Sequence, residues 1–94
     1  MSSLCVKARI SGKVQGVWYR RSTQQKAVSL GVTGHAINLE DGSVEVLMYG
    51  GAMQVDALSQ WLWQGSEDAQ VAKVELEPVN HDASKPLPDA FTTG

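Results

Sequence analysis

The sequence predicts an α+β fold in which an antiparallel sheet carries two helices on one face. Four segments alternate between apolar and polar residues, which is the period of a half-buried strand. Two other segments repeat apolar residues at spacings of three and four, which is the period of a helix. Glycines separate most of these segments, as expected at turns and helix ends. The 94 residues therefore predict one small domain with a modest core.

The first third of the chain predicts a strand, a turn and a helix. Apolar residues alternate over residues 4–10 and predict a strand with one buried face. Two glycines predict a turn at 12–17. Residues 19–30 place Tyr19 and Ala27 on one helical stripe, and Gly31 is well placed to end this helix in the left-handed conformation.

The middle of the chain predicts a β-hairpin. Residues 32–39 and 43–49 read as strands, and the Asp-Gly pair at 41–42 between them is a strong hairpin signal. We expect Val44, Val46 and Met48 to face the core, and Gly50-Gly51 to end the second strand.

The last part of the chain predicts one more helix and one more long strand. Residues 53–64 form the helix, which ends at Gly65. Residues 70–79 alternate, with Ala72, Val74 and Leu76 expected to face inward. A loop follows at 80–89, and Phe91 is a candidate anchor for a short last strand or a frayed end.

The order strand, helix, strand, strand, helix, strand is that of the split β-α-β or ferredoxin-like arrangement. We expect a single domain over 1–94. The segment 80–94 would supply a loop and a short strand at its C-terminal end.

Charge is distributed unevenly along the chain. The net charge is −2, but residues 1–39 contain no Asp or Glu, whereas residues 40–94 contain all ten. Six bases fall in the first segment: Lys7, Arg9, Lys13, Arg20, Arg21 and Lys26. A local positive field on an acidic protein favours a small anionic ligand, because nucleic-acid binding normally needs a strongly basic domain.

Targeting signals and cysteine chemistry are not evident. The chain has no basic and apolar leader and no stretch of membrane-spanning length, so we expect a cytoplasmic protein that does not bind membranes. Cys5 is the only cysteine, which excludes an intrachain disulfide and a cysteine-rich metal site.

The residues between the first strand and the first helix form the candidate anion site. A glycine turn that opens a helix presents unpaired N–H groups and the positive end of the helix dipole, and Arg20 and Arg21 follow this turn. The two glycines match neither a P-loop nor a dinucleotide fingerprint. Spacing alone leaves open a plain strand-to-helix turn with solvated arginines.

Asn38 is a second candidate at the same edge of the sheet. Strands joined through a helix normally run parallel, so the first and second strands should end at one rim. Asn38 lies at the end of the second strand and offers both a donor and an acceptor. An ordinary residue before a turn is the alternative, since Asn is common there.

The stretch from Gly12 to Arg20, GKVQGVWYR, resembles the acylphosphatase signature Gly-x-Val-Gln-Gly-Val-x-aromatic-Arg. The family's second motif is also matched in order, by Gly34, Asn38, Gly42, Val44 and Gly50. The resemblance spans about residues 3–79. Two positions depart from the family pattern: His35 replaces an aromatic residue, and Ile37 stands where a polar or basic residue is commoner.

The resemblance implies hydrolysis of the carboxyl–phosphate bond of small acyl phosphates. Arg20 and the backbone N–H groups of the loop would hold the phosphoryl group, and Asn38 would orient the attacking water. The loop residues implied are Gln15, Gly16, Val17, Trp18 and Tyr19. The resemblance also implies a monomer that uses no metal or cofactor.

Other readings remain open at this point. A non-catalytic acyl-phosphate or carbamoyl-phosphate binding module is one alternative. An RNA-binding module would need stacking aromatics on the open sheet face, and only Tyr49 is available there. His35 and His81 lack a third ligand for a metal. Trp18 could line the mouth of the site or merely pack against the rest of the protein.

Overall fold

The computed structural model describes residues 3–80 and 88–94. Its elements follow the predicted order, including a short strand at the C-terminal end. They are β1 (Ser3–Lys13), α1 (Tyr19–Leu30), β2 (Thr33–Asn38), β3 (Val44–Gly51), α2 (Ala52–Trp61), β4 (Gln70–Pro78) and β5 (Phe91–Thr92).

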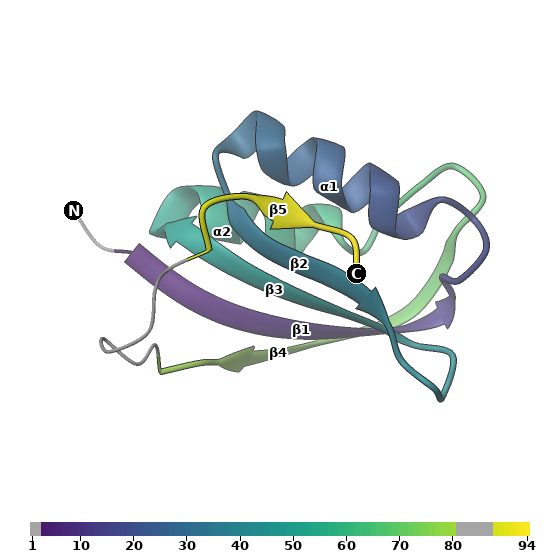
Figure 1. The fold of residues 1–94 in the computed structure, drawn as a ribbon. Coiled ribbons are helices and arrows are strands. Elements are labelled where there is room, and N and C mark those ends of the chain that lie inside the picture. The colour runs from purple at the N-terminus through teal and green to yellow at the C-terminus, as the bar shows by residue number, and fades with distance from the viewer. Residues whose placement is uncertain (1–2, 81–87) are drawn as a thin grey trace.

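The strands form one sheet in the order β4-β1-β3-β2-β5 (Figure 1). Strand β3 is antiparallel to both β1 and β2, so β1 and β2 run in the same direction and end at the same rim, as predicted. Strand β5 is parallel to β2. The four long strands therefore form the predicted antiparallel sheet, and the short β5 makes the complete sheet mixed. The cause is the C-terminal segment, which lies alongside β2 and runs the same way.

Both helices cover one face of the sheet, and the core lies between them and the strands (Figure 1). The expected inward faces are confirmed for the central strands, where Ala8, Ile10, Val44, Val46 and Met48 are fully buried. Both helices contribute to the same core: α1 through Tyr19, Thr23 and Ala27, and α2 through Val55, Leu58 and Ser59. One continuous core thus fixes the position of every element.

Two strand boundaries differ from prediction. Strand β1 continues to Lys13 and so takes in the first two residues of the expected turn. Gly12 permits this, because a side chain there would meet the carbonyl oxygen of Gln70 at 2.2 Å. Strand β3 includes Gly50 and Gly51, which pair with Leu4 and Ser3 instead of ending the strand. The loop before α1 is therefore shorter than expected and comprises residues 14–18.

The predicted inward face of β4 is only partly correct. Val74 packs against the core, but Ala72 is exposed and Leu76 is 53% exposed. The register shifts opposite Ser11 and Gly12, so that Val71 rather than Ala72 reaches the core. A bulge of this kind reverses the alternation of side chains beyond it. At the edge of the sheet, Leu76 is left largely uncovered.

The C-terminal strand is confirmed as an anchor. Phe91 is buried, and β5 pairs with β2 at Gly34 and His35. Most of the expected loop at 80–89, including His81, lies outside the described residues.

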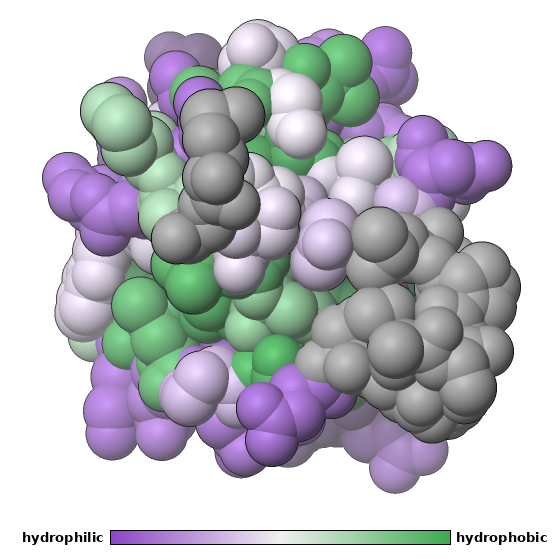
Figure 2. Space-filling model, turned by 90° about the vertical axis from the view of Figure 1, so that its left-hand side faces the viewer, coloured by the Kyte–Doolittle hydropathy of each residue, from purple (hydrophilic) through white to green (hydrophobic). Residues whose placement is uncertain are grey.

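The end of the molecule where β1 begins and β3 leads into α2 is shown in Figure 2. Hydrophobic residues lie exposed there among polar ones. Leu4, at the start of β1, and Met53, in the first turn of α2, are among the exposed large hydrophobic residues of the molecule. No helix in the part of the chain that the structure describes is long and apolar enough to cross a membrane.

Candidate active site

The opposite end of the sheet brings three segments together. The loop 14–18 leaves β1 and enters α1 there, and the turn 39–43 joins β2 to β3 (Figure 1). The C-terminal residues follow β5 toward the same rim. This is the rim at which the sequence predicted both the anion-binding loop and Asn38.

The loop adopts a conformation suited to binding an anion. Gly16 and Trp18 have positive φ angles of 75° and 63°, and Val17 between them does not. Alternation of this kind turns successive N–H groups toward one side and makes a concave anion-binding surface. None of the N–H groups from Gly16 to Arg21 donates a hydrogen bond to a described residue. Several donors are thus available at the positive end of α1.

Buried side chains hold the two ends of this loop in place. Val14 and Val17 belong to the core. Tyr19 is buried at the first turn of α1, and its hydroxyl donates a 2.6 Å hydrogen bond to the carbonyl of Leu62. Burial raises the pKa of Tyr19 above its ordinary range, so the phenol is a neutral anchor. The loop is therefore a fixed element of the fold.

Ser66 orients one peptide group of the loop. Its hydroxyl donates a 2.6 Å hydrogen bond to the carbonyl of Val17. A trans peptide directs its C=O and N–H to opposite sides, so this bond aims the N–H of Trp18 away from Ser66. Nothing in the local sequence pattern around Ser66 marks this contact.

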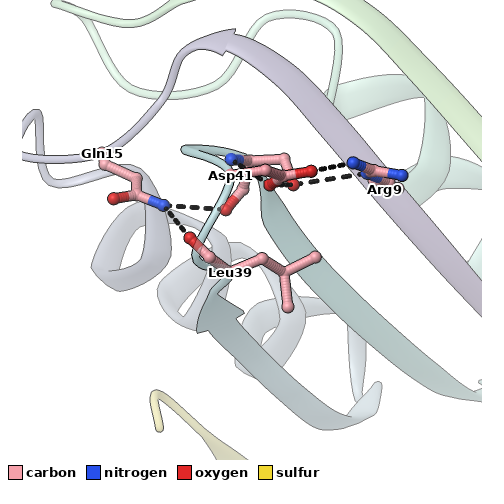
Figure 3. Close-up of polar contacts among 5 residues, drawn as sticks. Arg9, Gln15, Leu39 and Asp41 are labelled. Carbon is pink, nitrogen blue, oxygen red and sulfur yellow. Dashed lines mark hydrogen bonds and ion pairs between the residues drawn. The ribbon is translucent and has the colours of Figure 1, made fainter.

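Gln15 connects the loop to the β2–β3 turn. Its side-chain nitrogen donates hydrogen bonds of 2.9 Å to the carbonyl oxygens of both Leu39 and Ser43 (Figure 3). These carbonyls stand at the two ends of the turn and are also bonded by the turn's own N–H groups. Leu39 directly follows Asn38, so Gln15 joins the loop to the segment that carries Asn38. Sequence reasoning gave a role to the backbone of Gln15 and missed its side chain.

A second set of contacts holds the turn from the uncovered face of the sheet. The carboxylate of Asp41 accepts from the N–H and the hydroxyl of Ser43 and pairs with Arg9 of β1 (Figure 3). Asp41 is thus a turn residue, as expected, and its negative charge is paired with a guanidinium. The turn is fixed on both sides.

Arg20 lies in the first turn of α1 and lines a pocket of about 640 Å³. Gly16, Trp18 and Tyr19 line the same pocket, together with Arg21 and Thr93. One guanidinium nitrogen of Arg20 donates a 3.2 Å hydrogen bond to the carbonyl of Thr93. The other guanidinium donors have no partner among the described residues. A guanidinium presents five donors in a fork that matches phosphate oxygens, so most of this fork is available.

Asn38 is exposed at the last position of β2, opposite Val44. Its carboxamide has no hydrogen-bond partner within residues 3–80 and 88–94. It does not line the pocket of Arg20. The two residues still approach the same rim, because Thr92 pairs with His35. Thr93, which accepts the hydrogen bond from Arg20, is the next residue along. It therefore lies beside β2 at a position about 7 Å before Asn38.

The sequence-derived candidates divide into two groups. Arg20 and the loop residues Gly16, Trp18 and Tyr19 meet in one pocket. Asn38, Gln15 and Val17 lie outside its lining, although Gln15 joins the loop to the residue after Asn38. Thr93 at the pocket wall was not anticipated, because strand pairing near a chain end is not visible in a sequence pattern.

The remaining candidates lie elsewhere. His35 forms a 3.0 Å contact with Glu45 across β2 and β3, away from the loop. Within the described ranges, no three His, Cys, Asp or Glu side chains are grouped so that they could hold a metal ion. Trp61 packs on the core and Trp63 is 53% exposed. Cys5 is half-buried, and burial raises the pKa of its thiol, so its pattern is that of a packed residue.

Comparisons of the sequence and of the structure with known proteins all indicate the same family. The Acylphosphatase family model matches residues 6–92. An acylphosphatase of Xanthomonas euvesicatoria is 62% identical over 85 residues, which cover 90% of this chain and 92% of the relative. An acylphosphatase of Chromohalobacter salexigens is 45% identical over the full length of both chains. The solved structure of an acylphosphatase from Coxiella burnetii superimposes with a TM-score of 0.89 at 34% identity, covering 98% of this chain and 93% of that one.

Proposed function

The chain belongs to the acylphosphatase family and hydrolyses acyl phosphates, and we propose that Arg20 and the loop 15–19 bind the phosphoryl group while Asn38 orients the attacking water. The observation that carries this proposal is that the N–H groups from Gly16 to Arg21 and most guanidinium donors of Arg20 have no hydrogen-bond partner among the described residues. Gly16, Trp18, Tyr19 and Arg20 line one pocket, at the positive end of α1.

Phosphoryl transfer of this type needs little covalent catalysis by the protein. The leaving group is a carboxylate, which departs without protonation at neutral pH, since its own pKa is about 4. What remains is to hold the substrate in line with a water and to stabilise charge on the equatorial oxygens. The loop N–H groups and the Arg20 fork supply that stabilisation. Their fixed positions mean that no reorganisation is needed as charge develops.

Asn38 serves as the water-positioning group. Its carboxamide oxygen accepts a hydrogen bond from the water and its amide group can donate to a phosphate oxygen. The water oxygen forms a new bond to phosphorus as the bond from phosphorus to the carboxylate oxygen breaks and the carboxylate leaves with the electron pair. An amide cannot take the proton, so the water's proton passes to a phosphate oxygen of the substrate. A rate profile governed by a protein histidine would contradict this step.

The experiment is to measure release of inorganic phosphate from acetyl and benzoyl phosphate by the wild type, Arg20→Ala and Asn38→Ala, with and without a chelator. We expect turnover to survive the chelator and kcat/KM to fall about 1,000-fold in each variant, as when a preorganised donor to the reacting group is removed. Arg20→Ala should also lose affinity for inorganic phosphate. Asn38→Ala should keep that affinity and lose kcat.

Arg21→Ala is the matched control, because Arg21 follows Arg20 in the same turn of α1 and lines the same pocket, but is exposed. We expect a change of less than about 3-fold, through weaker long-range attraction of the anion. Equal losses in Arg20→Ala and Arg21→Ala would contradict a specific role for Arg20. Phosphate binding without turnover in the wild type would favour a binding module.

A further inference from the structure

We propose that Trp18 forms an acyl subsite, so that the enzyme prefers acyl phosphates whose acyl group is a flat aromatic ring. This inference rests on the proposed function of the loop, because the subsite adjoins the position of the phosphoryl group. It concerns the indole side chain of Trp18, whereas phosphate binding concerns its backbone N–H.

The pocket has room for more than a phosphoryl group. Its volume of about 640 Å³ is typical of a small-molecule site. Gly16 and Arg20 occupy the wall assigned to the phosphoryl oxygens. Trp18 lines the same pocket, with Gln25 and Arg21 farther along the helix. An acyl group attached to a phosphate held at Arg20 would therefore lie against this second part of the wall.

Trp18 is in an unfavourable state for a residue with only a structural role. Its indole is 71% exposed, and it is the only described non-glycine residue with a positive φ angle. That conformation costs about 1–2 kcal/mol for an L-residue, and glycine would adopt it freely. Strain of this kind is concentrated at functional sites.

The indole is free to receive a ligand. Its ring makes no stacking contact with another aromatic ring in residues 3–80 and 88–94, where the one ring pair is Tyr19 with Trp61. Its N–H has no partner within those ranges. An exposed aromatic face beside a phosphate site offers an offset-stacked or edge-on contact to a planar acyl group. A small aliphatic acyl group would gain little from it.

The test compares kcat/KM for benzoyl phosphate with kcat/KM for acetyl phosphate in the wild type, Trp18→Ala, Trp18→Gly and Trp18→Phe. Any change in loop geometry alters both rates, so their ratio isolates the acyl subsite. We expect the benzoyl-to-acetyl ratio to fall about 3- to 10-fold in Trp18→Ala and Trp18→Gly, the range of an aromatic contact. Trp18→Phe keeps a ring and should keep most of the preference.

Two further variants sharpen the result. Trp18→Gly removes the strain as well as the ring, so a ratio that falls equally in Trp18→Gly and Trp18→Ala assigns the effect to the ring. Trp63→Ala, which removes another exposed indole outside the pocket, should leave the ratio unchanged. A ratio unaffected by Trp18→Ala and Trp18→Gly would overturn the subsite, as would an equal fall in Trp63→Ala. If the wild type turned over neither substrate, the proposed function itself would be rejected.

Discussion

The chain passes from a strand into a helix at two places, and the two junctions differ in backbone conformation and in charge. Strand β1 reaches α1 through the loop 14–18, which has two left-handed residues and is followed by Arg20 and Arg21. Strand β3 enters α2 directly at Gly51, whose backbone is extended, and the first turn of α2 is Ala52, Met53 and Gln54. Neither helix has a side-chain cap or an acidic residue in its first turn.

If the α1 junction binds the phosphoryl group as proposed, this difference is what converts an ordinary helix start into a ligand site. Both helices have unpaired N–H groups at their N-termini, so the dipole alone does not distinguish them. Two arginines in the first turn of α1 oppose that dipole and are unfavourable for the helix by itself. A bound anion offsets this repulsion. On the proposed function, the α1 junction is therefore arranged for a ligand, whereas the α2 junction is arranged for packing.

The largest effect among the loop variants should come from Gln15, which ties the α1 junction to the turn after Asn38. Gln15→Glu replaces two donated hydrogen bonds with a negative charge facing two carbonyl oxygens. We expect kcat/KM to fall on the order of 100-fold, and about 10-fold in the neutral Gln15→Leu. Gln54→Leu, in the first turn of α2, is the matched control and should leave activity unchanged. An equal effect of Gln54→Leu and Gln15→Leu would remove the distinction between the junctions.

A pair of glycines separates loop geometry from stability. Gly16 and Gly31 have similar φ angles of 75° and 72°, and a Cβ atom at either would meet nothing within 4 Å. Alanine should therefore lower the free energy of unfolding at each site by a similar 1–2 kcal/mol or so. Only Gly16→Ala should also reduce kcat/KM, by roughly 10-fold. Urea unfolding and steady-state kinetics on both variants test this, and similar activity losses at the two sites would contradict it.

Ser66 provides a smaller test of the same loop. Ser66→Ala removes one hydrogen bond to the carbonyl of Val17, which lowers the free energy of unfolding by about 1 kcal/mol. Because the N–H of Trp18 is then less well oriented, KM should rise about 3-fold. Ser29→Ala also removes a bond to a backbone carbonyl, but at the far end of α1, and should leave KM unchanged. A rise in KM with Ser29→Ala would indicate a general effect on the helix.

Substitution of Tyr19, which anchors α1, should have the smallest effect on activity. Its expected effect is on stability. Burial raises its pKa above the ordinary value of 10.0, so the folded state retains the phenol proton at pH values where the unfolded chain has lost it. The stability from the neutral phenol is complete below pH 10 and decreases as the pH rises above it. Urea unfolding between pH 8 and about 11 should show this decrease. Tyr19→Phe should lower stability at pH 8 and lose this part of the pH dependence.

Much of the fold was predictable because it depends on local periodicity and glycine placement. The bounds of α1 and the left-handed cap at Gly31 agree with prediction, since an apolar stripe and a terminal glycine are both local signals. The bulge opposite Gly12 was not predictable, because it depends on how β1 meets β4. For the same reason the exposure of Leu76 and the parallel pairing of β5 were missed.

The candidate site was predictable in part for a similar reason. Contiguous residues of one motif supply the loop and Arg20, and topology places Asn38 on the same rim. The contacts that fix this arrangement join distant parts of the chain: Gln15 to Leu39, Ser66 to Val17 and Arg20 to Thr93. A single sequence contains no signal for such pairings, and they follow only from the folded structure.

The central claim is that the α1 junction, and not the α2 junction, binds the phosphoryl group. A titration with inorganic phosphate, followed by the ¹H–¹⁵N NMR signals of the backbone, tests it most directly. We expect saturable shifts that are largest for the N–H groups of residues 16–20, little change at residues 52–54, and much weaker binding in Arg20→Ala. Shifts of equal size at both junctions, or shifts spread over the lysines and arginines without saturation, would contradict the account.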